Sequence, residues 1–276
     1  MNNLSLDDLI KSALEEDIGH GDVTTMSLIP EEQEGKGIFY AKAEGIVAGT
    51  MVCSRVFNHL DSGIEFKVFK NDGESVAPGD IIAEAQGKMQ ALLMGERVAL
   101  NFLQRLSGIA TKTRCMTELI KHFKAVLVDT RKTTPGLRAL EKYAVTVGGA
   151  RNHRFALYDG VMIKDNHIQA VGGIQKAVSL ARQTVPHTLK IEVEVESLQQ
   201  LKEALEAQAD IIMLDNMDAE TMKKAVEMVN GRALLEASGG ITAESIAEIA
   251  RTGVDYISCG ALTHSVYSLD ISFKIS

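Results

Sequence analysis

The sequence has little of what defines several large classes of protein. Its three cysteines, Cys53, Cys115 and Cys259, lie far apart and show no metal-ligand spacing. Their odd number and scatter favour buried, reduced thiols over a disulfide framework, so we expect a cytoplasmic protein. No apolar run approaches the roughly 20 residues that a membrane-spanning helix needs. Residues 1–19 are acidic and amphipathic, which is not the pattern of a secretory signal.

The chain also lacks an excess of positive charge. Its formal net charge is −8 and its pI is near 5.4, which argues against general binding to nucleic acid or to a membrane surface. The 276 residues are 45% apolar and 24% charged, as is typical of a soluble globular protein. This length suits one large domain or two ordinary ones.

One segment, from Asp129 to His167, is nevertheless basic. Its seven arginines and lysines outnumber its acidic residues; they are Arg131, Lys132, Arg138, Lys142, Arg151, Arg154 and Lys164. Positive charge confined to one segment of an acidic protein indicates a discrete anion site, because an anionic polymer would need basic charge spread widely.

The first half of the chain has a mixed pattern of helices and strands. Apolar spacing predicts helices at 4–15 and 51–60 and strands at 37–47, 64–69 and 81–85. A long helical region follows from about 89 to 123. We expect Gly108 to break it and the region to cross between domains.

From Val126 onward, short apolar runs alternate with amphipathic helices. Six such runs are present: VLVD, GVMIK, LKIEVEV, DIIMLD, ALLEA and DYISCG. This alternation predicts βα units on a parallel sheet. A complete TIM barrel has eight strands, so six indicate an incomplete barrel or an open sheet. Three runs end in Asp129, Lys164 and Asp215, and catalytic groups of barrels gather at that edge, which favours the barrel.

Glycine-rich loops after the last two runs predict a phosphate site. Glu236 to Ile241 reads EASGGI, and Ser258 to Ala261 reads SCGA. Glycine lets backbone N–H groups approach a phosphate, and the N-terminus of a following helix adds a favourable dipole. Each loop alone could be an ordinary turn, but the pair occupies the position where barrels commonly bind phosphate.

Acidic side chains alternate along another run. Period two places Glu192, Glu194 and Glu196 on one face of the strand, which is costly unless that face lines a polar cavity. With Asp215 on the next strand, these carboxylates could hold Mg²⁺ or ribose hydroxyls, or form salt bridges to the basic residues. His153 and His167 lack a third ligand at metal spacing, so zinc is not expected. Arg97 lies on a polar helix face that is usually solvated.

Taken together, these motifs resemble the quinolinate phosphoribosyltransferase family over nearly the whole chain. The matching segments are EEDIGHGDVTT, GERVALNFLQRLSGIAT, DTRKTTPGLRALEKYAV, GGARNHRFALYDGVMIKDNH, EVEVES, LDNM, EASGGI and ISCGALTHS. The resemblance implies a type II phosphoribosyltransferase of the α/β class, with an N-terminal α/β sandwich (1–112 and 266–276) and an incomplete α/β barrel (113–265). It also implies a homodimer, or a higher oligomer, in which Arg97 reaches the partner's site, contrary to the solvated reading above.

The resemblance assigns roles to individual residues. The substrate-binding positions that it implies are Arg97, Thr130, Arg131, Lys132, His153, Arg154, Lys164, Glu194, Asp215, Ser238, Gly239, Gly240 and Gly260. Among them Lys132, Lys164, Glu194 and Asp215 are expected to be catalytic, and Glu194 and Asp215 to lie near magnesium.

The implied reaction transfers phosphoribosyl from phosphoribosyl diphosphate to quinolinate with decarboxylation, in de novo NAD synthesis, with Mg²⁺ as cofactor. Three alternatives stay open. One is a paralogous phosphoribosyltransferase that uses another base. Another is an aldolase-like enzyme in which Lys164 forms a Schiff base. A non-catalytic module that binds phosphosugars is a third, weaker alternative.

Overall fold

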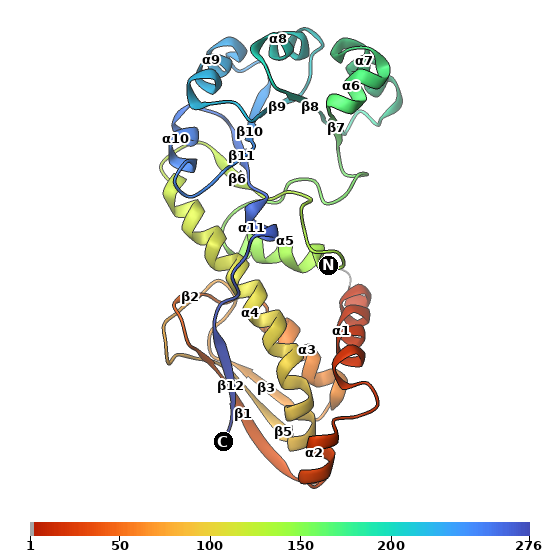
Figure 1. Cartoon of the computed structure of the whole chain (residues 1–276), viewed down its shortest axis with the longest axis vertical. Coiled ribbons are helices and arrows are strands. Elements are labelled where there is room, and N and C mark those ends of the chain that lie inside the picture. The colour runs from red at the N-terminus through yellow and green to blue at the C-terminus, as the bar shows by residue number, and fades with distance from the viewer. Residues whose placement is uncertain (1–2) are drawn as a thin grey trace. The chain divides into compact units, whose positions relative to one another are not determined.

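The computed structural model describes residues 3–276, which form two units (Figure 1). Unit 1 holds residues 3–114, 134–149 and 265–276, and unit 2 holds 115–133 and 150–264. The predicted division assigned 134–149 to the barrel, whereas their contacts group them with unit 1. The predicted first domain also includes residues 1 and 2, which lie outside the described part. The domain boundaries themselves stay a prediction. No helix among the described residues is long and apolar enough to cross a membrane.

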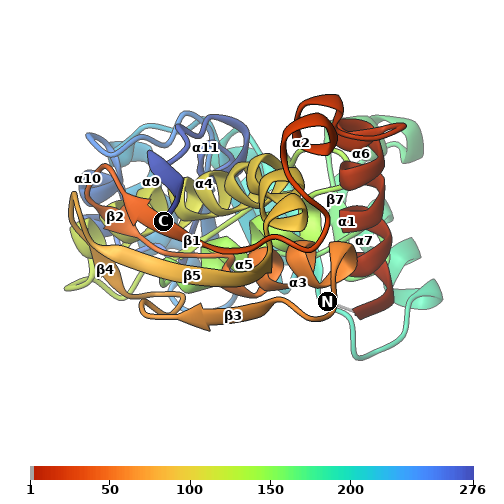
Figure 2. The ribbon, with the colours of Figure 1, turned by 90° about the horizontal axis from the view of Figure 1, so that it is seen from below.

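Unit 1 is built on an antiparallel sheet of order β12-β1-β5-β3. Its strands are β1 (Glu34–Ala41), β3 (Glu65–Val68), β5 (Ile81–Lys88) and β12 (Ile271–Ile275), and a separate pair joins β2 (Gly45–Ile46) to β4 (Ser75–Val76). Figure 2 shows β1, β5 and β3 side by side. Strand β12 comes from the end of the chain and pairs with β1, so the C-terminal residues complete this sheet.

Aromatic side chains tie the sheet of unit 1 to its helices. The helices are α1 (Asn3–Ile18), α2 (Val23–Leu28), α3 (Thr50–Leu60), α4 (Met89–Ile120, which extends into unit 2) and α5 (Arg138–Val147). Phe39 of β1 packs against Phe57 of α3, with ring centroids 6.1 Å apart, and against Phe273 of β12 at 4.7 Å. The Cys53 thiol of α3 donates to Ala99 O of α4. Helix α3 therefore contacts both the sheet and α4.

The predicted break at Gly108 is wrong, because α4 runs without interruption from Met89 to Ile120. A Cβ at Gly108 would lie 2.2 Å from Tyr267 O. The glycine therefore serves a close approach of the C-terminal segment to the helix rather than a bend. Among the cysteines, Cys53 and Cys259 are buried as expected, but Cys115 is exposed.

Unit 2 is a parallel sheet of six strands in the order β6-β11-β10-β9-β8-β7. Its strands are β6 (Val126–Val128), β7 (Val161–Ile163), β8 (Ile191–Val195), β9 (Ile211–Asp215), β10 (Leu234–Ser238) and β11 (Tyr256–Ser258). Its helices are α6 (Asp165–Val171), α7 (Ile174–Thr184), α8 (Leu198–Glu206), α9 (Ala219–Val229), α10 (Ile246–Arg251) and α11 (Ala261–His264). The six predicted runs are these six strands, and Figure 1 shows α7, α8 and α9 outside them.

The sheet does not close into a full barrel. Beyond β6, Arg151 makes a single parallel bridge to Val128, and the chain then reaches β7 without another strand. The predicted fold class, an incomplete barrel, is confirmed by this sheet. In β8, Ile191, Val193 and Val195 are fully buried on one side, so the glutamates that alternate with them face the other side.

Candidate active site

A pocket of about 530 Å³ lies at the carboxyl edge of the parallel sheet. Most of the residues that line it stand at or just beyond strand ends, and all belong to unit 2. Eleven of the predicted binding residues line it: Thr130, Arg131, Lys132, His153, Arg154, Lys164, Glu194, Asp215, Ser238, Gly239 and Gly240. Met162, Met213, Asn216, Glu236 and Ser258 also line it, and the prediction had given them no role.

Two predicted residues are not among those that line this pocket. A Cβ at Gly260 would lie 3.0 Å from Lys132 Cδ and 3.1 Å from His264 Cδ2, so this glycine allows a close approach of two basic side chains. Arg97 belongs to α4 in unit 1, where its side chain is 59% exposed and its Nη2 lies 3.9 Å from Glu96.

The positively charged side of the pocket is positioned by buried main-chain contacts. Asp129 is fully buried at the end of β6 and accepts the main-chain N–H of His153 at 2.8 Å. The main-chain oxygen of Lys132 accepts from the Thr263 hydroxyl at 2.8 Å. Asp129, which the sequence suggested as a chemical group, therefore holds the neighbouring segment in place.

Arginine side chains concentrate positive charge in this pocket. Arg154 Nη1 donates to Gly160 O at 3.0 Å. Burial lowers the pKa of the Arg154 guanidinium, the nearby charge of Arg131 lowers it further, and Glu192 opposes both effects. Arg131 and Arg154 are thus close enough to repel each other, and an anion between them would relieve that repulsion.

Carboxylates line the same pocket as these cations. Lys164 Nζ lies 2.5 Å from Glu194 Oε2, and Asp215 accepts from the Asn216 side-chain amide at 2.8 Å. Both readings of the acidic residues have support: Glu194 forms a salt bridge to a basic residue, and both acids also line a polar pocket. Two carboxylates beside a substrate phosphate are a usual set of protein ligands for Mg²⁺.

The glycine loop after β10 has the backbone that the sequence predicted. Gly239 and Gly240 have φ of +94° and +60°, and a Cβ at Gly239 would lie 2.2 Å from Asn216 Oδ1. Helix α10, however, begins only at Ile246. The predicted helix dipole directly after this loop is therefore wrong, and the loop can offer its main-chain N–H groups and the Ser238 hydroxyl.

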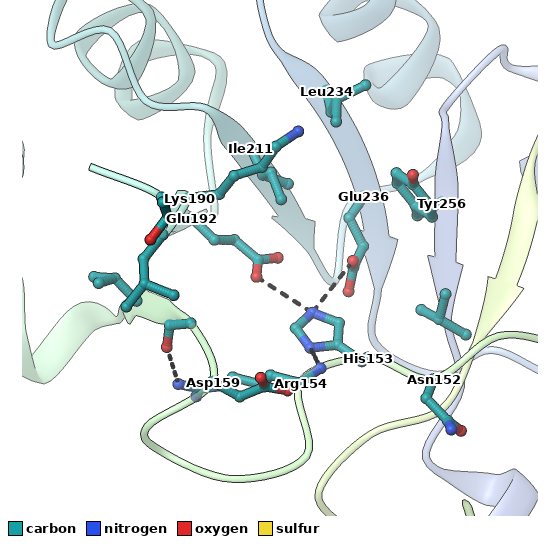
Figure 3. A pocket seen from close by; sticks show the side chains of 15 residues that line it. Asn152, His153, Arg154, Asp159, Lys190, Glu192, Ile211, Leu234, Glu236 and Tyr256 are labelled. Atoms are coloured by element: carbon teal, nitrogen blue, oxygen red, sulfur yellow. Dashed lines mark hydrogen bonds and ion pairs between the residues drawn. The ribbon is translucent and has the colours of Figure 1, made fainter. Parts of the chain in front are cut away.

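Behind the cations lies an interior cluster of His153, Glu192 and Glu236 (Figure 3). His153 Nε2 lies 3.2 Å from Glu192 Oε2 and 3.4 Å from Glu236 Oε2, and the two glutamates are only 4% and 3% exposed. Burial alone would lower the pKa of His153, but the bonds to both carboxylates raise it to about 10. Burial raises the pKa of Glu192, although its bond to His153 opposes the shift. Both shifts favour a proton bound within the cluster.

The sequence did not predict this cluster. Glu192 was expected on the polar face of its strand, and Glu236 was noted only as part of a loop. The two residues are brought together because β8 and β10 flank β9 in a curved sheet. A second pocket, of about 410 Å³, lies at the strand starts and shares His153, Arg154 and Glu236 with the first.

Comparison with family models covers both parts of the chain. Residues 22–107 match the model described as "Quinolinate phosphoribosyl transferase, N-terminal domain". Residues 109–274 match the one described as "Quinolinate phosphoribosyl transferase, C-terminal domain".

Individual proteins are similar over the full length. A probable nicotinate-nucleotide pyrophosphorylase [carboxylating] of Bacillus subtilis is 49% identical, over 100% of this chain and 95% of its own. A protein of the same name from Synechocystis is 46% identical, over 98% and 92%. The crystal structure of NadC from Streptococcus pyogenes has a TM-score of 0.96 and 44% identity, over 100% and 98% of the two chains. The nicotinate-nucleotide pyrophosphorylase from Francisella tularensis gives 0.96 and 40%, with the same coverage.

Proposed function

The chain belongs to the quinolinate phosphoribosyltransferase family, and we propose that its carboxyl-edge pocket transfers phosphoribosyl from phosphoribosyl diphosphate to quinolinate. The pyridine ring then loses its 2-carboxylate, giving nicotinate mononucleotide, diphosphate and CO₂. One observation carries the proposal: five basic side chains, three carboxylates and a Ser-Gly-Gly loop line one pocket. That combination suits a dicarboxylate together with a phosphorylated sugar.

The basic residues are proposed to hold the two carboxylates of quinolinate and the diphosphate. Arg131 and Arg154 offer forked donors that match a carboxylate, while Lys132 and Lys164 supply compact charges. His153 lies beside Arg154 in the same pocket. Because these charges are assembled before the substrate arrives, their contribution is placement and electrostatic stabilisation.

The sugar is proposed to lie between the acidic pair and the glycine loops. Ser238, Gly239 and Gly240 would bind the 5′-phosphate through N–H and hydroxyl donors, with Gly260 and Thr130 beside the same ligand. Glu194 and Asp215 would receive the ribose hydroxyls and stabilise the positive charge that develops on the sugar ring. The salt bridge between Glu194 and Lys164 supports this assignment. The two opposite charges balance each other until the substrates bind between them.

The acidic pair also fits a magnesium ion. Mg²⁺ keeps most of its water and takes one or two carboxylates plus substrate phosphates, and Glu194 and Asp215 offer that set in one pocket. When bound, the ion would supply positive charge beside the departing diphosphate. The two carboxylates would hold it, and the basic residues would orient the diphosphate.

The reaction proceeds by electron movements that these charges favour. The pyridine nitrogen forms a bond to C1 of the ribose while the bond from C1 to the diphosphate oxygen breaks. The ring nitrogen is then positively charged and accepts electron density. The bond between ring carbon 2 and its carboxylate therefore breaks with release of CO₂, and that carbon takes up a proton.

We also propose a homodimer in which Arg97 of one subunit completes the site of its partner. The largely exposed side chain of Arg97, whose neighbouring carboxylate is 3.9 Å away, supports an arginine that is available to a second subunit. A cytoplasmic location remains a prediction from the sequence.

A direct comparison of acceptors tests the function. Nucleotide formation is measured with quinolinate and, separately, with nicotinate, each with phosphoribosyl diphosphate and Mg²⁺. We expect turnover with quinolinate only; a preference for nicotinate would favour a paralogous enzyme. Trapping of a carbonyl substrate on Lys164 by borohydride would instead favour the aldolase-like reading. The salt bridge from Lys164 Nζ to Glu194 argues against that reading, since the amine that would attack a carbonyl is already paired with a carboxylate.

A further inference from the structure

Two buried carboxylates face one histidine nitrogen immediately behind the proposed quinolinate subsite. Glu192 and Glu236 are almost fully buried, and His153 Nε2 lies within 3.4 Å of both (Figure 3). Each glutamate has a second oxygen, Oε1, for which the described residues provide no hydrogen-bond partner. Buried carboxylates with unmet hydrogen-bonding capacity are costly, so their presence calls for a functional reason.

The His153 ring is fixed from both sides. The main-chain N–H of Arg154 donates to His153 Nδ1 at 2.7 Å. That bond occupies the lone pair of Nδ1, so in this arrangement the ring proton lies on Nε2 and points to the two carboxylates, and the additional proton of the cluster lies on a carboxylate oxygen. The glutamates therefore hold one edge of the ring while the Arg154 peptide holds the other.

The same hydrogen bond argues against a metal ion in the interior cluster. The three side chains offer ligand atoms that all lie within 4.8 Å of one another. A ring that accepts a hydrogen bond at Nδ1 keeps its proton on Nε2, which is the atom that would have to bind the metal. The cluster is arranged to orient the ring and not to ligate.

The cluster also supplies negative charge to the basic pocket. The positive charge of Arg131 repels the guanidinium of Arg154, and the negative charge of Glu192 attracts it. The buried negative charge of the cluster partly offsets this repulsion. His153 precedes Arg154 in the chain and its ring accepts the Arg154 main-chain N–H. The position of the ring therefore helps to fix the backbone of Arg154, from which the guanidinium extends.

We propose that Glu192 and Glu236 are positioning residues for quinolinate, which hold His153 and, through it, Arg154 in the orientation that receives the dicarboxylate. The proposal rests on the proposed function. It assigns the two glutamates no contact with substrate. It therefore predicts a selective loss of quinolinate affinity, because the sugar subsite is built from other residues.

Steady-state kinetics of the full-length protein test this proposal. Glu236→Met fills a similar volume but removes the acceptor, and we expect the KM for quinolinate to rise about tenfold or more. The KM for phosphoribosyl diphosphate should change by less than about twofold. Glu236→Gln keeps an acceptor oxygen and should recover much of the loss. Glu196→Gln, which removes an exposed charge just beyond β8, is the matched control and should behave as wild type.

Three outcomes would overturn the proposal. They are an unchanged KM for quinolinate in Glu236→Met, an equal rise in both KM values, or no recovery in Glu236→Gln. If Glu236→Met does not fold, the double variant Glu192→Gln/Glu236→Gln removes both charges with little change of shape. Its KM for quinolinate must then rise about fivefold or more, and a normal value would refute the proposal. Wild-type protein that does not turn over quinolinate would refute the proposed function, and this inference with it; normal wild-type turnover with unaffected variants would refute only the inference.

Discussion

The two ends of the parallel sheet hold pockets of similar size but different chemistry. The pocket at the carboxyl edge, of about 530 Å³, is lined by lysines, arginines, carboxylates and glycines. The one at the strand starts, of about 410 Å³, combines apolar residues where the strands begin, such as Val161, Ile211 and Leu234, with polar residues that include the interior cluster. Both are made by the same strands. The difference shows that the residues after a strand carry the chemistry, while those that begin it mainly pack.

The largest effect that would test this comparison comes from replacing one lysine at each end of the sheet by alanine. Lys164→Ala should lower kcat/KM for quinolinate by about 1000-fold, because it removes a charge from a preorganised anion site. Lys190→Ala removes the same charge at the strand start and should leave kcat/KM within about twofold. Turnover assays, with circular dichroism to confirm folding, measure both. Equal losses in the two variants would contradict the distinction between the ends.

A second test asks whether the carboxyl-edge pocket is complete within one subunit. Arg97→Ala and Arg154→Ala should each be nearly inactive alone. When the two are mixed under conditions that exchange subunits, half of the dimers are mixed, and each mixed dimer has one intact site. About a quarter of wild-type activity should therefore return. If no activity returns although mixed dimers form, Arg97 does not act across subunits.

A smaller effect separates the two glycines of the proposed phosphate loop. Gly239→Ala should raise the KM for phosphoribosyl diphosphate about tenfold, because its new Cβ would collide with Asn216 while the backbone stays at positive φ. The new Cβ of Gly240→Ala would have no atom within 4 Å. This variant should lose only about 1 kcal/mol of stability, because alanine disfavours the left-handed backbone at this position. Kinetics and thermal unfolding measure the two effects. A greater loss in Gly240→Ala would show that the loop is arranged differently.

The smallest expected effect is a pH dependence of stability from the interior cluster. The pKa of His153 is raised from its ordinary 6.5 to about 10, so folding takes up a proton between these values. The resulting stability is fully present below about pH 6.5 and is lost as the pH rises towards 10. The raised pKa of Glu192 acts in the same direction.

Denaturant titrations at pH 7 and pH 9.5 measure this dependence. Wild type should lose on the order of 1–3 kcal/mol more than Glu192→Gln/Glu236→Gln over that interval. Parallel losses in the two proteins would mean that the cluster binds no additional proton.

The sequence predicted best where the information is local. The six strands of unit 2 and the glycines at 239 and 240 follow from periodicity and turn chemistry over a few residues. The prediction for Gly108 was wrong because the residue that requires a glycine there is Tyr267, whose main chain packs against the helix and which lies 159 positions away in the chain (267 − 108). Glu192 and Glu236 were not paired in the prediction because their proximity depends on the curvature of three strands. Periodicity shows which face a residue occupies but not which residue lies opposite it.

Release of labelled CO₂ from quinolinate that carries the label in its 2-carboxylate tests the central claim most directly. The full-length protein should release one CO₂ for each diphosphate formed, and only when phosphoribosyl diphosphate and Mg²⁺ are both present. Release without the sugar diphosphate, or diphosphate formation without CO₂, would contradict a single pocket that joins ribosyl transfer to decarboxylation.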